Sequence, residues 1–257
     1  MIENLFSVEG KVAVVTGGTR GIGRMIAQGY VEAGARVIVA SRKEEACRET
    51  EASLAKLGSC TGIAADLSTE AGAAALARAV GEREPAVHVL VNNAGANWGA
   101  PLEAFPDAGW DKVFNLNLKG PFHMTVKLLP LLRKAATAED PARVINVGSI
   151  DGLQVPLLET YSYSSTKAGL HHLTRVLARK LAPEHITVNA VAPGPFESKM
   201  MAKTLQDFGD SIAKSNPRGR IGSPEDMAGV ALYLASRAGA YVTGAVIPVD
   251  GGIANTK

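Results

Sequence analysis

Short apolar runs alternate with amphipathic segments along nearly the whole chain, and this alternation limits the possible folds most strongly. The runs are short and rich in Val and Ile, which is typical of strands buried on both faces of a parallel sheet. The predicted strands lie at 11–16, 36–40, 60–65, 87–92, 143–147, 186–191 and 245–249, the third being the weakest. The predicted helices lie at 21–33, 44–57, 70–84, 107–134, 160–181 and 224–235. We therefore predict an α/β fold over residues 1–257: one domain with a doubly wound, seven-stranded parallel sheet and helices on both faces.

One segment interrupts the regular alternation. Residues 196–217 follow the sixth predicted strand, contain two adjacent methionines and end at a proline. Ligands of doubly wound sheets bind at the carboxyl ends of the strands, so a segment that starts there can close over a ligand. We predict a substrate lid at 196–217, and an ordinary pair of surface helices is the alternative.

Composition excludes several classes of function. The net charge is +2 with no basic block, which speaks against a nucleic-acid partner. Two cysteines are too few for a disulfide framework, and the five histidines show no metal-ligand spacing. The apolar runs fall short of the ~20 residues that a membrane span needs, and residues 1–9 lack the blocks of a signal peptide. We expect a cytoplasmic protein without a metal or a membrane partner.

A glycine-rich loop joins the first predicted strand to the first predicted helix. Glycines allow a tight turn and a close approach of a pyrophosphate, whose charge the N-terminus of the following helix favours. The spacing is Gly17-x3-Gly21-x-Gly23, which differs from the commonest dinucleotide-binding loop. The loop predicts a dinucleotide site with these residues: Gly17, Thr19, Arg20, Gly21, Ile22 and Gly23.

The end of the second predicted strand indicates which dinucleotide binds. An acidic residue at this position would bind the free ribose 2′-hydroxyl of NAD. Here Ser41 and Arg42 occupy it, and Arg20 lies in the glycine loop. Arginine can hold phosphate oxygens with two parallel hydrogen bonds, so these residues favour the 2′-phosphate of NADP(H).

Tyr163 and Lys167 stand four residues apart in the predicted helix 160–181. This spacing places a phenol and an ammonium on one helix face, within reach of one ligand. A tyrosine titrates near ~10 in water, and a neighbouring cation lowers this pKa. The pair can therefore deliver a proton at neutral pH, although a single match of this kind is a weak signal.

Taken together, the glycine loop, Asn92-Asn93-Ala94-Gly95, Ser149 and the Tyr163–Lys167 pair occur in an order that resembles the short-chain dehydrogenase/reductase family. The resemblance covers about residues 8–252 and implies a Rossmann-like fold. The run from Asn93 to Gly99 is similar to NADPH-dependent 3-ketoacyl reductases, and within them to the type associated with rhamnolipid synthesis.

The resemblance implies catalytic roles for four residues. Tyr163 would protonate the carbonyl oxygen as hydride arrives, and Lys167 would lower the tyrosine pKa and bind the nicotinamide ribose. Ser149 would orient the same oxygen, and Asn117 would hold a water in the proton relay. These roles agree with the chemistry of carbonyl reduction: Tyr163 is a positioned proton donor, Lys167 is a charge that adjusts its pKa, and Ser149 is a second dipole at the developing oxyanion.

The resemblance also implies further cofactor contacts and partners. The additional cofactor residues would be Asp66, Leu67, Asn93, Gly95, Pro193, Gly194 and Ser198. The resemblance suggests a homotetramer that uses residues 119–133 and 160–181 at one interface. Acyl carrier protein is a possible partner, but Glu184 stands where some relatives carry a basic residue that recognises it.

Three functions remain open from the sequence. The first is an NADPH-dependent reductase of 3-ketoacyl thioesters on acyl carrier protein or coenzyme A. The second is a reductase or dehydrogenase of a small polyol, sugar or cyclic ketone. The third is a non-catalytic dinucleotide-binding regulator, against which the intact Ser149, Tyr163 and Lys167 argue. The interval from Ser149 to Tyr163 is fourteen, one more than is common in the ketoacyl reductases that the chain resembles, and this difference implies that the loop 150–161, which shapes the substrate pocket, is bulged.

Overall fold

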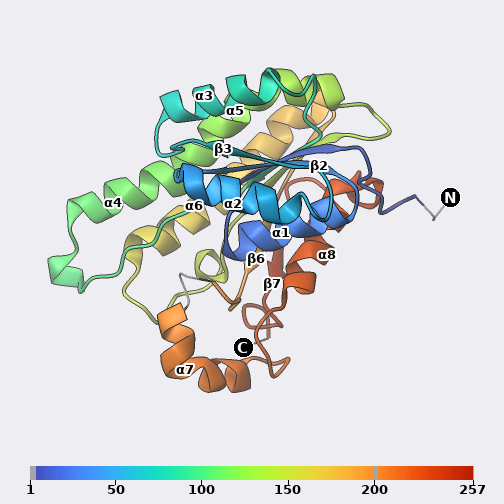
Figure 1. Cartoon of the computed structure of the whole chain (residues 1–257). Helices are drawn as coiled ribbons and strands as arrows, with labels where there is room; N and C mark the ends of the chain where they lie inside the picture. The colour runs from blue at the N-terminus through green and yellow to red at the C-terminus, as the bar shows by residue number, and fades with distance from the viewer. Residues whose placement is uncertain (1–3, 199–201, 257) are drawn as a thin grey trace.

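The seven predicted strands form one parallel sheet in the computed structural model, which describes residues 4–198 and 202–256 (Figure 1). Their order across the sheet is β3-β2-β1-β4-β5-β6-β7. The bounds are β1 Val12–Thr16, β2 Arg36–Ser41, β3 Cys60–Ala64, β4 Val89–Asn92, β5 Ala142–Val147, β6 Ile186–Pro193 and β7 Val246–Val249. The predicted α/β class and the doubly wound topology are confirmed.

Helices cover both faces of the sheet, as Figure 1 shows. One layer holds α1 (Gly21–Glu32), α2 (Glu44–Leu54) and α8 (Pro224–Ala235). The other layer holds α3 (Glu70–Gly81), α5 (Gly120–Ala135) and α6 (Tyr161–Leu181). The two helix layers bury aliphatic clusters against the sheet, because β1, β2 and β4 alternate Val, Ile and Leu toward opposite faces.

The prediction of one continuous α-helix over 107–134 is wrong. The chain forms α4 (Asp107–Phe114), then one π-helical turn (Asn115–Lys119), then α5. A π turn widens the helix by one residue and is frequent at functional sites. It lies where Asn117 was expected to act.

The segment predicted as a lid contains α7 (Ala202–Ser215), which stands apart from the two helix layers in Figure 1. Residues 199–201 of the predicted lid lie outside the described residues. Phe196 and Asn216, near the two ends of this segment, are buried, and Asn216 Nδ2 donates a hydrogen bond to the Asp250 carbonyl at 3.0 Å. The segment is therefore anchored to the body at both ends.

Three charged residues meet at the amino ends of the strands. Lys11 Nζ donates hydrogen bonds to both carboxylate oxygens of Asp140, at 2.7 and 2.8 Å. Arg143 is buried, forms an ion pair with Asp140, and donates to the Ser236 carbonyl at 2.8 Å. Burial alone would raise the pKa of Asp140, but Lys11 and Arg143 hold that pKa below its ordinary value. One carboxylate thus compensates two largely buried cations.

Asp140→Asn is expected to lower the free energy of unfolding by about 2 kcal/mol. The substitution leaves two buried cations without an anion, and breaking a fully buried ion pair in this way costs about 3–5 kcal/mol. We expect a smaller loss here because the Asp140 side chain is about a third exposed, so that solvent screens the interaction. Since the pKa of Asp140 is lowered, its contribution exists above pH 3.8 and is lost as pH falls below it. Urea unfolding at pH 7 measures the effect, with Glu49→Gln on the exposed side of α2 as control. Equal stability of the two variants would contradict the expectation.

Among the described residues, no helix combines the length and apolar character that membrane crossing requires. The same part of the chain contains no cluster of three or more His, Cys, Asp or Glu able to hold a metal ion.

Candidate active site

The glycine loop follows β1 and leads directly into α1. Gly17 and Gly21 adopt φ angles of 64° and 51°, a left-handed region that favours glycine. A Cβ added to Gly17 would lie 2.8 Å from Asn93 Nδ2. The loop therefore presents bare backbone and the N-terminus of α1, which together form a cradle for a phosphate group.

The carboxyl ends of β1 and β4 are joined by hydrogen bonds of the Thr16 hydroxyl and of the Asn93 side-chain amide. Thr16 Oγ1 accepts hydrogen bonds from the N–H groups of Asn93 and Ala94, at 2.9 and 3.0 Å, and donates to the Val91 carbonyl at 3.1 Å. Asn93 Nδ2 donates to the carbonyls of Thr16 and Gly17, at 2.9 and 3.1 Å. The predicted cofactor residue Asn93 thus fixes the glycine loop, and Thr16 is a supporting residue that sequence reasoning did not single out.

Ser41 and Arg42 lie at the carboxyl end of β2, one strand away from the glycine loop. The Arg42 side chain is exposed, as is Arg20. Asp66 accepts hydrogen bonds from the Ser68 N–H and hydroxyl, which lower its pKa, and the charge of Arg42 contributes to the same shift. Leu67 beside it is buried. The predicted adenosine side of the site is therefore assembled along the β1–β2–β3 edge.

The carboxyl end of β6 forms the opposite side of the site. Pro193 is buried at the end of the strand, and the Gly194 N–H donates to the Val249 carbonyl at 3.0 Å. Gly194 packs so closely on Asp250 that an added Cβ would lie 2.7 Å from the Asp250 Cβ. A Cβ added to Gly21 would lie 3.1 Å from the Ser198 Cβ. The fold therefore brings Ser198 to the glycine loop from a distance of 177 positions in the sequence.

Tyr163 and Ser149 meet above the end of β5. Ser149 lies two residues after the last residue of the strand, and Tyr163 lies in the first turn of α6. Burial raises the pKa of Tyr163 to about 12, although its hydrogen bond with Ser149 acts to lower this pKa, and the charge of Asp151 raises it. At neutral pH the phenol therefore carries its proton, and its oxygen and that of Ser149 converge on the same point.

Lys167 lies one helical turn beyond Tyr163 and is 5% exposed. Its Nζ donates to the Val147 carbonyl at 2.7 Å and lies 5.5 Å from the centre of the Tyr163 ring. Burial lowers the pKa of Lys167 to about 8, and the charge of Asp151 opposes this shift. The protein therefore maintains a buried ammonium beside the phenol at a cost in stability, as expected for a functional group.

Asn117 occupies the π turn and reaches toward the same space. Its Oδ1 accepts from the Ala96 N–H at 2.8 Å, and its Nδ2 donates to the Ala96 carbonyl at 2.9 Å. A Cβ added to Gly95 would lie 3.4 Å from Asn117 Oδ1 and 3.9 Å from Lys167 Nζ. The side chain of Asn117 thus holds the turn after β4 in place beside Lys167. The predicted site residues Gly95, Asn117 and Lys167 lie together.

The interval between Ser149 and Tyr163 contains one short 3-10 helix, η3 (Ile150–Gly152), followed by irregular chain. Several apolar side chains of this irregular chain are exposed beside the site: Leu153, Val155, Leu157 and Leu158. Exposed apolar groups of this kind mark a binding surface more often than a structural one. Asp151 is a further acidic residue at the site, and sequence reasoning missed it although it stands only two positions after Ser149.

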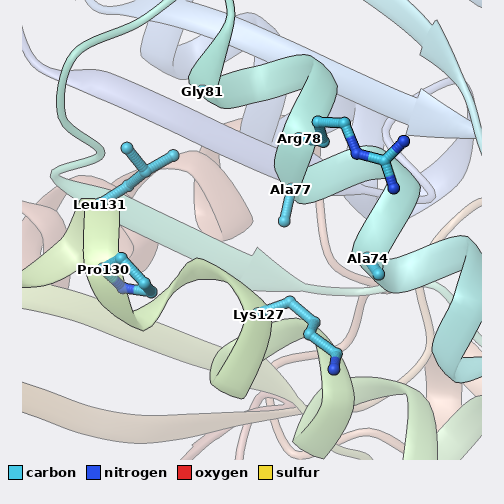
Figure 2. Close-up of a pocket in the computed structure, with 7 residues that line it drawn as sticks. All are labelled: Ala74, Ala77, Arg78, Gly81, Lys127, Pro130 and Leu131. Carbon is cyan, nitrogen blue, oxygen red and sulfur yellow. The ribbon is translucent and has the colours of Figure 1, made fainter.

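A separate groove of about 290 Å³ lies between α3 and α5 (Figure 2). It is lined by Ala74, Ala77, Arg78, Gly81, Lys127, Pro130 and Leu131. Lys127 reaches across to α3, where its Nζ donates to Glu70 Oε1 at 2.6 Å. The predicted site residues do not line this groove, so it is distinct from the dinucleotide site.

Comparison with known proteins agrees with the geometry. A family model described as "Enoyl-(Acyl carrier protein) reductase" matches residues 17–254. A rhamnolipid-biosynthesis 3-oxoacyl-[acyl-carrier-protein] reductase of Pseudomonas aeruginosa is 52% identical over 249 residues, which cover 96% of this chain and 97% of the relative. The chain belongs to the short-chain dehydrogenase/reductase family.

Two further comparisons, one with a solved structure and one with a relative of another name, bear on the range of functions. A structure described as the RhlG/NADP active-site complex of Pseudomonas aeruginosa superimposes with a TM-score of 0.95 at 50% identity, covering 98% of this chain and 100% of that one. A 2-dehydro-3-deoxy-D-gluconate 5-dehydrogenase of Dickeya dadantii is 35% identical over 259 residues, covering 98% of each chain. Members of this family thus share the fold and the reaction type, but their names give different substrates, so family membership alone does not determine the substrate.

Proposed function

We propose that this protein is an NADPH-dependent reductase that converts 3-oxoacyl thioesters into 3-hydroxyacyl thioesters. The observation that carries the proposal is the convergence of the Ser149 hydroxyl, the protonated Tyr163 phenol and the Lys167 ammonium beside the glycine loop. The 52% identical relative named as a 3-oxoacyl reductase supports the substrate class.

The residues of the site divide the reaction between them. NADPH, when bound, supplies the hydride that reaches the carbonyl carbon. Ser149 and Tyr163 donate hydrogen bonds to the carbonyl oxygen, and the Tyr163 proton passes to that oxygen as negative charge develops on it. Lys167 stabilises the phenolate that remains, and the π turn at Asn117 holds the chain next to Lys167 in place.

The residues present fit NADP(H). Gly17 and Gly21 let the loop turn with positive φ angles where an added Cβ would press on Asn93 or Ser198, and the N-terminus of α1 favours the pyrophosphate. Arg20, Ser41 and Arg42 would hold the 2′-phosphate, and Ser198 lies where it can contact the pyrophosphate or the carboxamide. The NADP complex of the relative supports this cofactor. The remaining cofactor contacts that we propose come from Thr19, Ile22, Gly23, Asp66, Leu67, Asn93, Gly95, Pro193 and Gly194.

Arg42→Asp is expected to move cofactor preference toward NADH. The substitution removes a charge-assisted contact to the 2′-phosphate, worth about 1.5–3 kcal/mol, and puts a carboxylate where it can bind a free 2′-hydroxyl. The NADPH/NADH ratio of kcat/KM should fall about 100-fold. Lys43→Asp, which makes the same charge change at the next residue, is the control. An unchanged ratio in the Arg42 variant would refute the assignment.

The exposed apolar side chains between Ser149 and Tyr163 support an aliphatic substrate. Leu153, Val155 and Leu157 lie between Ser149 and Tyr163 in the chain, and Val155 and Leu157 are almost fully exposed. A polyol would gain little from such a surface, whereas burying it against an acyl chain contributes about 25 cal/mol per Å². Segment 196–217, including α7, is proposed as the lid that covers the chain.

A substrate panel tests the proposal. NADPH consumption is measured with acetoacetyl-CoA, longer 3-oxoacyl thioesters on coenzyme A and acyl carrier protein, cyclic ketones and keto sugar acids. We expect kcat/KM to rise with chain length among the thioesters. A higher kcat/KM for the sugar acids, which the Dickeya dadantii relative makes the second candidate, would refute the proposal. Binding of NADPH without turnover of any ketone would favour a regulator.

Acyl carrier protein is the proposed carrier, on the strength of the relatives' names. The structure adds one constraint, because Arg133 is held by Glu184 through hydrogen bonds of 2.5 and 3.2 Å. This pair reduces the charge that Arg133 can offer to an acidic carrier. The exposed Arg175 and Arg179 on α6 are the better candidates for carrier contacts.

We also propose a homo-oligomer, a homotetramer by family resemblance, that forms through α5 and α6. Two pairs of exposed apolar side chains, each at four-residue spacing, lie on α4 and α5: Trp110 and Phe114, and Phe122 and Val126. Val176 on α6 is 51% exposed. Exposed apolar side chains that gather on one surface are typical of an interface between proteins. A cytoplasmic location agrees with the two buried free thiols, Cys47 and Cys60.

Phe122→Glu is expected to dissociate this oligomer into smaller species. A charge in the centre of an apolar interface must be desolvated without a partner, which costs several kcal/mol for each copy. Light scattering coupled to size exclusion measures the mass. Leu57→Glu, an equally exposed leucine just beyond α2, is the control and should leave the mass unchanged. Unaltered mass of the Phe122 variant would exclude α5 from the interface.

A further inference from the structure

Asp151 places a carboxylate inside the candidate active site that the proposed reaction does not use. It belongs to η3, and its main-chain N–H donates to Ser149 Oγ at 3.1 Å. The side chain is partly buried. Because the hydrogen bond to Ser149 comes from the backbone, the carboxylate has no part in it and is free to act on other groups.

The packing of η3 places Asp151 next to the catalytic helix α6. A Cβ added to Gly152 would lie 2.7 Å from both the Lys167 carbonyl carbon and the Ala168 nitrogen on α6. The same Cβ would lie 2.9 Å from His171 Cε1. The backbone of η3 therefore packs directly on the backbone of α6, and this contact holds Asp151 beside Lys167.

The charged and titratable groups around this point come from two elements. From α6, Tyr163, Lys167 and His171 face the end of β5 and η3, and from η3 comes Asp151. Burial lowers the pKa of His171 to about 4, assisted by the charge of Lys167, so the imidazole is neutral at physiological pH. Burial raises the pKa of Asp151, but the charge of Lys167 opposes this. Asp151 is the acidic group whose charge acts on both Tyr163 and Lys167.

We propose that Asp151 is a positioning residue for proton delivery: its carboxylate keeps Lys167 charged and the Tyr163 phenol protonated, which extends carbonyl reduction to higher pH. The proposal rests on the roles assigned above to Tyr163 and Lys167. These two groups titrate as a coupled pair. Removing a nearby negative charge lowers the pH at which the pair loses its first proton, whichever of the two groups releases it.

Asp151→Asn tests the proposal because it removes the charge and keeps the shape and the backbone hydrogen bond. We expect the high-pH limb of kcat/KM for reduction to move down by about one pH unit, with little change at the low-pH side. Asp151→Glu keeps the charge and should restore the limb toward that of the wild type. Asp107→Asn, at the exposed start of α4, is the matched control and should leave the profile unchanged.

A second readout needs no turnover. NMR titration of the Lys167 side chain in the ligand-free protein, assigned with Lys167→Met, should show a midpoint below the wild-type value in Asp151→Asn. Where turnover is measurable, an unmoved limb overturns the proposal, as does an equal shift in Asp151→Glu. If no ketone is reduced by the wild type, the proposed function fails separately, and an unmoved Lys167 midpoint then overturns the role of Asp151.

Discussion

Tyr163→Phe reduces turnover of a 3-oxoacyl thioester by about 10³-fold while the affinity for NADPH stays within a factor of two to three of the wild type. This expected result follows from the site geometry, because the phenol is the donor whose proton reaches the carbonyl oxygen, and a positioned acid contributes about 10²–10⁴-fold. The aromatic ring and Lys167 remain in place, so cofactor contacts are kept.

Steady-state kinetics with acetoacetyl-CoA and fluorescence titration with NADPH measure the two quantities. Tyr161→Phe is the matched control, because Tyr161 lies two residues earlier in the same helix and its hydroxyl donates to Glu159 Oε1 at 3.0 Å, away from Ser149. It should retain most of the turnover. Retained turnover in the Tyr163 variant would refute the proton-donor role.

Lys167→Met is expected to abolish most of the activity and yet stabilise the ligand-free protein. Burial lowers the pKa of Lys167 from 10.5 to about 8, and at 1.36 kcal/mol per unit the buried charge costs about 3 kcal/mol at pH 7. The variant loses the hydrogen bond to the Val147 carbonyl, worth about 1 kcal/mol, which leaves a net gain of about 2 kcal/mol. Turnover should fall about 10²-fold or more, because the phenolate loses its cation.

The pH dependence of this gain has a definite sign. Between pH 8 and 10.5 the unfolded chain holds the Lys167 proton and the folded protein does not, so wild-type stability rises with pH in this window. The advantage of Lys167→Met should therefore shrink as pH rises through the same window. Thermal unfolding at a series of pH values measures it. A variant that is less stable than the wild type at pH 7 would contradict the expectation.

The sheet and its flanking helices could be predicted from the sequence because burial on both faces leaves a strong local signal. The valine-rich strands β1 and β2 and the periodic helix α1 are examples, and their predicted bounds agree with the structure to within one residue at each end. The π turn at Asn117 could not be predicted, because it depends on the tertiary contact between that side chain and Ala96.

The chemistry of the site was predicted less completely than its location. Ser149, Tyr163 and Lys167 follow from their order and spacing, and the structure brings them together. The pKa of Tyr163 was expected to be lowered by Lys167, but in the ligand-free protein burial and Asp151 raise it. The sign depends on burial and on a carboxylate from another element, which spacing along one helix does not report.

The charged cluster of Lys11, Asp140 and Arg143 lies at the end of the sheet opposite to the catalytic groups. Substitutions at well-separated sites add nearly independently in free energy. Stability in this enzyme can therefore also be changed at positions far from the catalytic groups. A substitution near Lys167 that lowers the free energy of unfolding can be compensated by a stabilising substitution at the amino ends of the strands. Changes that alter the substrate range can in this way be tolerated without loss of the fold.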